Sequence, residues 1–270
     1  MIRSPLFAAL LAALVGPFAT AGHSAFADAP LGCSPKPAPP ADDFSEPPNF
    51  SLAVPLLKQK LIYYRCTRYD ADIAKIVDDA LAWVKYRAPQ LPAPAIVLDI
   101  DETSLSNWTR IFRDKFEYIP AGPCDLGDDS KPCGDGEWER SESAPAIAAT
   151  LALYKFARCI ELAPPCRPIE VFFITGRKEN WPAIRGKTPR QWTRENLIAV
   201  GYAGVDDDHL ILRSDHDNGV ADYKSGARAE IETKRHLTII ANLGDQESDL
   251  VGGHAERPFK LPDPFYYIPP

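Results

Sequence analysis

The chain has 270 residues, 45 % of them hydrophobic, with a formal net charge of -7 and six cysteines. That length supports one sizeable core, so a single domain with an insertion is the default. The acidic balance argues against nucleic acid as a partner. Beyond the N-terminal segment, no stretch has the ~20 apolar residues of a transmembrane helix.

The N-terminal segment has the pattern of a secretory signal peptide. An apolar stretch at residues 6–18 follows one positive charge and leads to an A-x-A site that ends at Ala27, so we expect cleavage after Ala27 and a periplasmic or secreted protein. Residues 28–55, rich in proline and polar side chains, predict an extended arm. A lipid anchor on Cys33 is the less favoured alternative, because Cys33 lies far beyond the apolar stretch and Pro30 stands where an aliphatic residue is needed.

The cysteines predict disulfides, because their number is even and the chain is expected to be exported; six cysteines allow 15 pairings. Closeness in sequence favours two short loops and leaves one longer pair by elimination. The three favoured pairs are Cys124–Cys133, Cys159–Cys166 and Cys33–Cys66. A zinc site is disfavoured, since no C-x-x-C pair or Cys/His cluster occurs.

A helical segment is expected before the first strand. Apolar positions recur at helical spacing from residue 56 to about residue 87. The spacing predicts one or two helices, broken near residues 69–72 and ending before Pro89, with their apolar faces on the sheet.

Residues 95–103 read A-I-V-L-D-I-D-E-T and predict a buried parallel strand that ends in two acids, Asp99 and Asp101. Ligands of open α/β sheets bind outside the carboxyl ends of such strands. Two buried, ionised carboxylates this close would repel each other, and a hard cation such as Mg²⁺ removes that repulsion. An acidic loop without chemistry is the alternative when the motif is taken alone.

Residues 104–143 have an irregular composition and predict an insertion that serves as a lid or binding loop. Its aromatic residues could stack on a nucleobase or an aryl group, or form a small core of their own, which we favour. The residues concerned are Trp108, Phe116, Tyr118 and Trp138.

The remainder of the chain predicts alternating helices and strands. Helices are expected from Pro145 to about residue 162, from Pro189 to about residue 200 and over 222–235, and strands over 169–174, 209–212 and 237–241. This alternation predicts a parallel sheet flanked by helices, an α/β fold.

Polar residues follow these elements in a fixed order: Asp99 and Asp101, then Thr175, then Lys224, then Asp245 and Asp249. The set resembles the four motifs of the haloacid dehalogenase (HAD) superfamily. The strings V-L-D-I-D-E-T, F-F-I-T-G-R, Y-K-S-G-A-R-A-E-I-E and N-L-G-D-Q-E-S-D-L, with the closing F-K-L-P-D-P-F-Y-Y-I-P, are most similar to its subfamily IIIB. That family of secreted acid phosphatases includes plant vegetative storage proteins and bacterial lipoprotein acid phosphatases. The resemblance implies a Rossmann-like domain over residues 56–270.

The resemblance also implies residue roles. Asp99 would be the nucleophile that forms an aspartyl-phosphate, and Asp101 the acid that protonates the leaving alcohol and then takes a proton from water. Thr175 and Lys224 would bind the phosphoryl group, together with the backbone N–H groups of Ile100 and Asp101.

The family's metal would be Mg²⁺. Its implied ligands are the Asp99 carboxylate, the Asp101 backbone carbonyl and Asp245, and Asp249 would orient the metal's waters or Lys224. Arg177 and Asn107 are plausible neighbours of the site, although no pattern in the sequence places them there.

The function expected from these observations is that of an exported, Mg²⁺-dependent acid phosphatase. Its partner would be a small phosphate monoester, such as a nucleotide or an aryl phosphate. Two alternatives stay open on the same fold: a non-catalytic storage or ligand-binding protein, and a phosphotransferase.

Overall fold

A computed structural model describes residues 29–38, 54–160, 165–214 and 219–269 of the chain. The predicted signal peptide and most of the predicted arm lie outside these residues. The predictions for the mature domain can be compared with the structure along almost its whole length.

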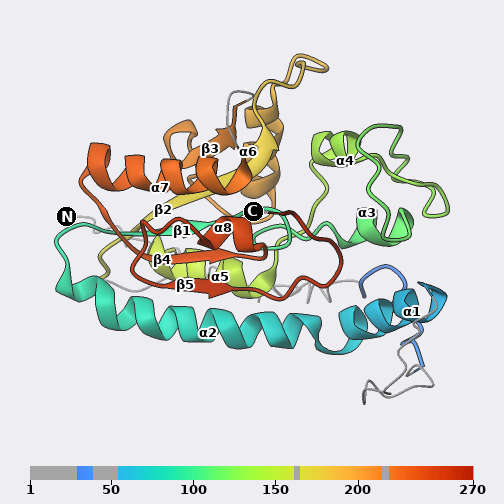
Figure 1. The fold of residues 1–270 in the computed structure, drawn as a ribbon, viewed down its shortest axis with the longest axis horizontal. Coiled ribbons are helices and arrows are strands. Elements are labelled where there is room, and N and C mark those ends of the chain that lie inside the picture. The colour runs from blue at the N-terminus through green and yellow to red at the C-terminus, as the bar shows by residue number, and fades with distance from the viewer. Residues whose placement is uncertain (1–28, 39–53, 161–164, 215–218, 270) are drawn as a thin grey trace, which may run out of the picture.

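The fold is built on a five-stranded, wholly parallel sheet in the order β3-β2-β1-β4-β5 (Figure 1). The strands are β1 (Pro94–Leu98), β2 (Glu170–Lys178), β3 (Leu210–Arg213), β4 (Thr238–Gly244) and β5 (Pro258–Lys260). The predicted α/β class and parallel sheet are confirmed. The sequence did not predict β5, whose three residues are too few to show a pattern.

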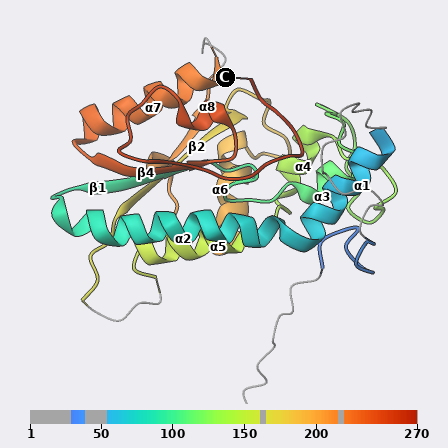
Figure 2. The same ribbon diagram turned by 60° about the horizontal axis from the view of Figure 1, so that its bottom comes forward.

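Alternate side chains of β1 are buried in two different hydrophobic cores, one on each face of the sheet. Ile96 and Leu98 belong to a large core shared with helices α2 and α5, whereas Ala95 and Val97 pack in a smaller core with Ile231 of α7. Figures 1 and 2 show α7 on one face of the sheet and α2 and α5 on the other. These helices are α2 (Asp70–Arg87), α5 (Ala148–Ala157) and α7 (Val220–Arg235). Both faces of β1 are therefore dry, as its continuous apolar run predicts.

The helical extension before the sheet is continuous. Helix α1 (Val54–Tyr64) leads through a π-helical turn (Arg65–Tyr69) directly into α2. The predicted break at residues 69–72 is wrong, because the chain widens its turn just before this point instead of leaving the helix. Within this turn, Tyr69 is fully buried.

The insertion contains two short helices, α3 (Trp108–Arg113) and α4 (Asp135–Ser141), beside the sheet in Figure 1. The indole N–H of Trp108 donates to the carbonyl of Leu31 at 2.8 Å, which ties the described part of the arm to α3. Both helices are too short to show an amphipathic period, which explains why the sequence suggested irregular structure.

Helix α5 begins at Ala148, not at Pro145, and ends at Ala157. Residues before it are extended, because the Ser106 N–H donates to the Pro145 carbonyl and the Ile147 N–H to the Ser104 carbonyl. The three favoured disulfide pairings are all present: Cys33–Cys66, Cys124–Cys133 and Cys159–Cys166.

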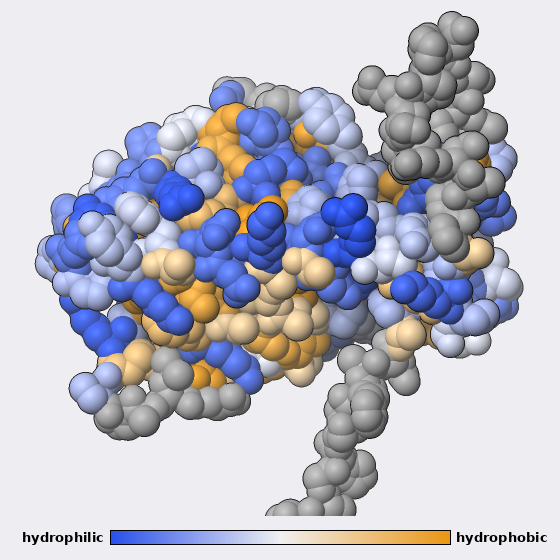
Figure 3. All heavy atoms as spheres, turned by 90° about the horizontal axis from the view of Figure 1, so that it is seen from below, coloured by the Kyte–Doolittle hydropathy of each residue, from blue (hydrophilic) through white to orange (hydrophobic). Residues whose placement is uncertain are grey.

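Two helices complete the carboxyl edge of the sheet: α6 (Pro189–Ala199) and the single turn α8 (Glu247–Leu250). Thr188 caps α6, within a capping box that includes Gln191, and the helix begins at Pro189 as predicted. Figure 3 looks onto the face that carries α2, where hydrophilic side chains surround apolar areas. Among the described residues, no helix is long and apolar enough to cross a membrane.

Candidate active site

A cavity of about 540 Å³ opens at the carboxyl ends of the strands. Its walls come from the β-strand ends, the insertion, the start of α7 and the C-terminal segment. Residues that bear on the chemistry include Asp99, Asp101, Asn107, Glu139, Arg177, Lys224, Asp245, Ser248, Asp249 and Tyr266. The topology brings together residues that are as much as 167 positions apart in sequence (99 to 266).

The turn after β1 fixes the two acids of the first motif. The Ile100 carbonyl accepts from the N–H groups of Thr103 and Ser104, and Glu102 takes a left-handed φ of 52° to close the turn. The Ser104 hydroxyl donates to the Asp99 carbonyl at 2.6 Å. The side chain of Ile100 is fully buried, so only its backbone is available for the predicted binding role.

Lys224 lies between two carboxylates. Its Nζ donates to Asp99 Oδ1 and to Asp249 Oδ1, each at 2.5 Å, and only 4 % of the lysine is exposed. Burial alone would lower the pKa of Lys224, but Asp249 and Asp99 outweigh that effect and hold its pKa above the usual range. The lysine is therefore a permanent cation. Asp99 Oδ2 accepts no hydrogen bond from the described residues and is the oxygen left open for chemistry.

Asp245 is held by neutral donors from three parts of the chain. Its Oδ1 accepts from the Thr103 hydroxyl at 3.1 Å, and its Oδ2 from Gln246 Nε2 at 2.7 Å and from the Tyr266 hydroxyl at 3.2 Å. Gly244 permits this packing, because a Cβ at that position would overlap Asp249. The closing segment of the chain thus forms part of the site.

The acid cluster fits a hard divalent cation. Asp99, Asp245 and Asp249 each bring a carboxylate oxygen within 4.8 Å of the others. Burial raises the pKa values of Asp99 and Asp245 well above their usual range, and Asp249 raises both further. The Ser248 hydroxyl, buried and without a hydrogen-bond partner in the described part of the chain, lines the same cavity. One lysine cannot neutralise three buried carboxylates, and oxygen donors are what Mg²⁺ prefers.

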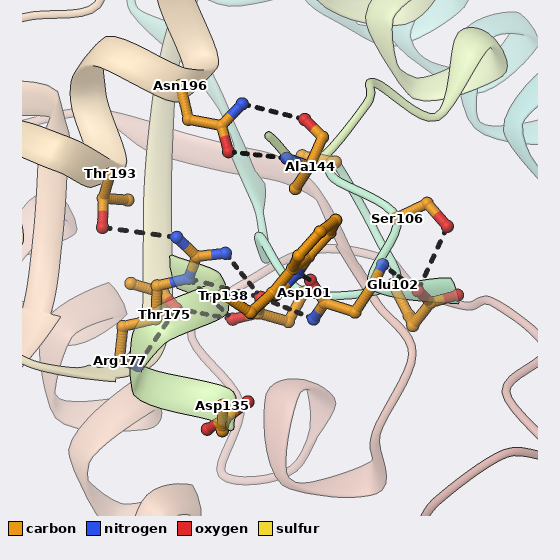
Figure 4. Close-up of polar contacts among 12 residues, drawn as sticks. Asp101, Glu102, Ser106, Asp135, Trp138, Ala144, Thr175, Arg177, Thr193 and Asn196 are labelled. Atoms are coloured by element: carbon orange, nitrogen blue, oxygen red, sulfur yellow. Dashed lines mark hydrogen bonds and ion pairs between the residues drawn. The ribbon is translucent and has the colours of Figure 1, made fainter. Parts of the chain in front are cut away.

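Asp101 belongs to a second cluster, drawn in Figure 4. Arg177 donates to its carboxylate from Nη2 at 2.7 Å and from Nε at 3.1 Å, and Asn107 Nδ2 donates at 2.8 Å. Burial would raise the pKa of Asp101, but the charge and hydrogen bonds of Arg177, with the bond from Asn107, lower it to about 2. The Asp101 side chain is 25 % exposed and that of Arg177 only 1 %, so the carboxylate faces the cavity over a buried guanidinium.

Thr175, on β2, is fully buried beside this second cluster. Its hydroxyl is 3.5 Å from Asp101 Oδ2 and accepts from the Arg177 N–H at 3.1 Å. The structure therefore gathers Asp99, Asp101, Lys224, Asp245 and Asp249 around one cavity, whereas Thr175 is fully buried behind its wall and does not line it. Their individual roles remain predictions.

Sequence reasoning assigned no place to several residues of the site. Arg177 and Asn107 were named as neighbours only, and Gln246 and Tyr266 were not singled out. The available signal for Arg177 was its position directly after Thr175-Gly176 at a strand end. For Tyr266 it was the closing string, whose match to the family extends to the last residues.

The aromatic residues of the insertion divide between the two roles considered for them. Trp108 and Trp138 are each only 2 % exposed and belong to the main core. Phe116 and Tyr118 line the cavity, and Tyr118 is 70 % exposed. The insertion thus contributes both to packing and to the wall of the site.

Comparison with known proteins agrees with this geometry. The sequence model of the HAD superfamily, subfamily IIIB (acid phosphatase), matches residues 49–269. The chain belongs to this family.

Among curated relatives, acid phosphatase 1 of Solanum lycopersicum is 33 % identical over 175 residues, which cover 64 % of this chain and 58 % of the relative. Vegetative storage protein 1 of Arabidopsis thaliana is also 33 % identical over 175 residues, covering 64 % and 55 %. The matched region thus spans little more than half the length of these relatives.

The fold is also that of a solved structure. The class C acid phosphatase from Bacillus anthracis superposes with a TM-score of 0.56 at 19 % identity, over 78 % of this chain and 86 % of that chain. At this identity the likeness shows the fold alone. The same bacterial protein has been solved with tungstate bound, at a TM-score of 0.55.

Proposed function

We propose that this chain is an exported, Mg²⁺-dependent acid phosphatase that hydrolyses small phosphate monoesters through an aspartyl-phosphate at Asp99. The observation that supports it most directly is the Asp99–Lys224 pair: one carboxylate oxygen is fixed by the lysine, and the other is open at a cavity. Membership of the acid phosphatase family supports the same activity.

In the first half-reaction, Asp99 Oδ2 would attack phosphorus while the bond from phosphorus to the leaving alcohol oxygen breaks. Lys224 would hold Asp99 Oδ1 and offset the negative charge of the phosphoryl group. Thr175 and the backbone N–H groups of Ile100 and Asp101 would bind phosphoryl oxygens. The product alcohol leaves with one proton, and the phosphoryl group stays on Asp99.

In the second half-reaction, water would attack phosphorus, the bond to Asp99 would break, and Asp99 would return as a carboxylate. Asp101 would deliver the proton in the first step and accept one from water in the second. Arg177 stabilises the ionised form of Asp101, so the proton taken from water in the second step would be readily given up to the leaving oxygen of the next substrate.

Mg²⁺ would be held by the Asp99 carboxylate, the Asp101 backbone carbonyl and Asp245, with Asp249 beside it. When bound, it would supply positive charge that stabilises the phosphoryl group in the transition state. The chain's own contribution is a rigid set of oxygen donors, fixed by Thr103 and Lys224.

Export is part of the proposal. Three disulfides suit an oxidising compartment outside the cytoplasm, and the signal-peptide pattern at residues 1–27 supplies a route to it. Phe116 and Tyr118, which line the cavity, provide apolar surface for the leaving group of a nucleotide or aryl phosphate.

The test is phosphate release from an aryl phosphate by the mature chain between acid and neutral pH. It should be run with Mg²⁺, with a chelator, and with the nearly isosteric variant Asp99→Asn. We expect the variant to lose at least about 10³-fold in turnover, because the nucleophile is removed while the shape is kept.

Asp78→Asn, the same change at an exposed position of α2, serves as the matched control and should keep full activity. Normal activity of Asp99→Asn would disprove the nucleophile assignment. No release by the folded, Mg²⁺-loaded wild type would favour the storage or ligand-binding function instead.

A further inference from the structure

Besides the residues that line the cavity, the insertion contributes one buried indole to the candidate active site. Trp138 of α4 is 2 % exposed, and its Nε1–H donates to Asn107 Oδ1 at 2.8 Å. In Figure 4, Trp138 lies next to Asp101 and Arg177, although the three residues come from different elements. Trp138 is thus in polar contact with Asn107, which lines the same cavity as Asp101.

This bond decides how the Asn107 amide is oriented. An indole N–H can only donate, so it selects the amide oxygen as its partner. The amide nitrogen then points the other way, and Nδ2 donates to Asp101 Oδ1 at 2.8 Å. If the amide turned over, its oxygen would face a carboxylate and its nitrogen would face an N–H, and both contacts would be repulsive.

The backbone of Asn107 is fixed independently of Trp138. Its N–H donates to Glu102 Oε1, and the same carboxylate accepts from the Ser106 hydroxyl at 3.3 Å and, at its other oxygen, from Tyr69 at 2.5 Å. Asn107 itself is 3 % exposed. The orientation of its side-chain amide is then fixed by the two contacts to Trp138 and Asp101.

Asp101 needs a contact of this kind. Arg177, near the end of β2, and Asn107, in the insertion, both donate to the Asp101 carboxylate. The carboxylate is therefore held by donors from two separate parts of the fold. We propose that Asn107, oriented by Trp138, is a positioning residue that aims the Asp101 carboxylate at the leaving-group oxygen. This rests on the proposed function, in which Asp101 transfers a proton to and from that position.

The test compares two substrates that differ in their need for a proton. An alkyl phosphate releases an alkoxide unless it is protonated, whereas 2,4-dinitrophenyl phosphate releases a stable phenolate. Trp138→Phe keeps a buried aromatic ring and removes only the N–H. We expect kcat/KM to fall about tenfold on the alkyl phosphate and less than about twofold on the dinitrophenyl ester.

Trp192→Phe is the matched control. Trp192 is also buried, at 1 % exposure, but its indole N–H has no hydrogen-bond partner among the described residues. The control should leave the ratio of the two kcat/KM values unchanged. If Trp138→Phe behaves like this control, the proposal is overturned.

A double-mutant cycle tests whether Trp138 acts through Asn107. Asn107→Ala should reproduce the selective loss on the alkyl phosphate, and adding Trp138→Phe to it should cost nothing more. A further loss in the double variant would show that Trp138 acts by packing and would overturn the proposal. If Trp138→Phe does not fold, Asn107→Ala decides alone: a selective loss supports the proposal, and an equal loss on both substrates rejects it.

Asp101→Asn in the same assay separates this proposal from the proposed function. A selective loss in Asp101→Asn without one in Trp138→Phe would reject the positioning role only. No selective loss in Asp101→Asn would remove the proton-transfer role of Asp101 itself.

Discussion

Two buried cations serve the same cavity in different ways. Lys224 is shared by two carboxylates, Asp99 and Asp249, at 2.5 Å each. Arg177 donates from Nη2 and Nε to one carboxylate, that of Asp101, and from Nη1 to the hydroxyl of Thr193 at 3.4 Å. Around Lys224, two carboxylates share one cation, which leaves an excess of negative charge. At Asp101, one carboxylate meets one cation, so the two charges balance.

Because of this difference in charge, the lysine side and the arginine side of the site are suited to different functions. A lysine is a compact point charge that can bridge two acids, whereas a guanidinium is a planar fork that fixes one carboxylate in orientation. The excess negative charge around Lys224, increased by Asp245, is where the divalent cation of the proposed function would be stabilised. The balanced Arg177 side needs no further ion and is suited to holding Asp101 still for proton transfer.

The largest expected effect comes from breaking the lysine side. Lys224→Met removes the shared cation and leaves Asp99 and Asp249 buried without compensation. We expect loss of measurable turnover and a fall of roughly 3 kcal/mol in the free energy of unfolding in metal-free buffer at neutral pH. Urea unfolding monitored by fluorescence measures the second quantity.

The control for this variant is Lys75→Met, the same change at an exposed position of α2. It should alter the free energy of unfolding by less than about 0.5 kcal/mol. Equal stability of Lys224→Met and wild type would mean that the two carboxylates are not ionised in the folded protein, which would contradict the picture of a charged cluster.

The two sides also differ in how far the sequence revealed them. Asp99, Asp245 and Lys224 could be placed because, in chain order, they fit the motifs of the family that the sequence resembles, and Asp99 also directly follows an apolar strand run. Strand ends in a parallel sheet meet at one edge, which explains why these motif residues lie together although they are far apart in sequence. The parallel sheet was predictable from the alternation of strands and helices.

Arg177 and Asn107 could not be placed in this way. The partner of Arg177, Asp101, lies 76 positions away in the turn after the neighbouring strand, and the contact exists only once β1 and β2 are in register. Asn107 depends on Trp138, which reaches it through an insertion whose helices are too short to show a period. The start of α5 was predicted wrongly for a similar reason. The Pro145 carbonyl accepts from the Ser106 N–H, and this tertiary contact keeps Pro145 extended although proline favours the first turn of a helix.

A smaller effect is expected from altering the arginine side while keeping its charge. Arg177→Lys cannot form the two-pronged contact with Asp101 or reach Thr193 at the same time. We expect kcat/KM to fall about 10- to 100-fold, with a loss of roughly 1–2 kcal/mol in the free energy of unfolding. Steady-state kinetics and urea unfolding measure the two effects.

Arg194→Lys provides the comparison for Arg177→Lys. Arg194 pairs with Asp207 at 2.5 Å on the surface, where the aspartate side chain is 58 % exposed. Exposed pairs contribute little, so this variant should change stability by less than about 0.5 kcal/mol. If both substitutions had the same small effect, the fork geometry at Asp101 would not matter.

The smallest effect concerns Glu139, a nearly buried acid on the arginine side of the cavity. Burial, with Asp101 and Asp135, raises the pKa of Glu139 to about 8, although Arg177 and Arg110 act against the rise. Between its ordinary pKa and pH 8, the unfolded chain releases a proton that the folded chain keeps. The free energy of unfolding therefore falls as the pH rises through this interval.

Glu139→Gln removes this dependence, because an amide does not titrate. Relative to wild type, we expect the variant to gain roughly 1–2 kcal/mol in the free energy of unfolding between pH 5 and pH 8. Glu137→Gln on the same helix, where the glutamate side chain is 42 % exposed, should show no such pH-dependent gain. A constant difference at both pH values would mean that Glu139 is ionised when folded, and Arg177 would then have to be shared by two carboxylates as Lys224 is. The gain we expect follows because Asp101 already neutralises Arg177, and Arg110 pairs with Asp135 at 3.1 Å and with Asp114 at 3.7 Å, so neither cation is left for Glu139.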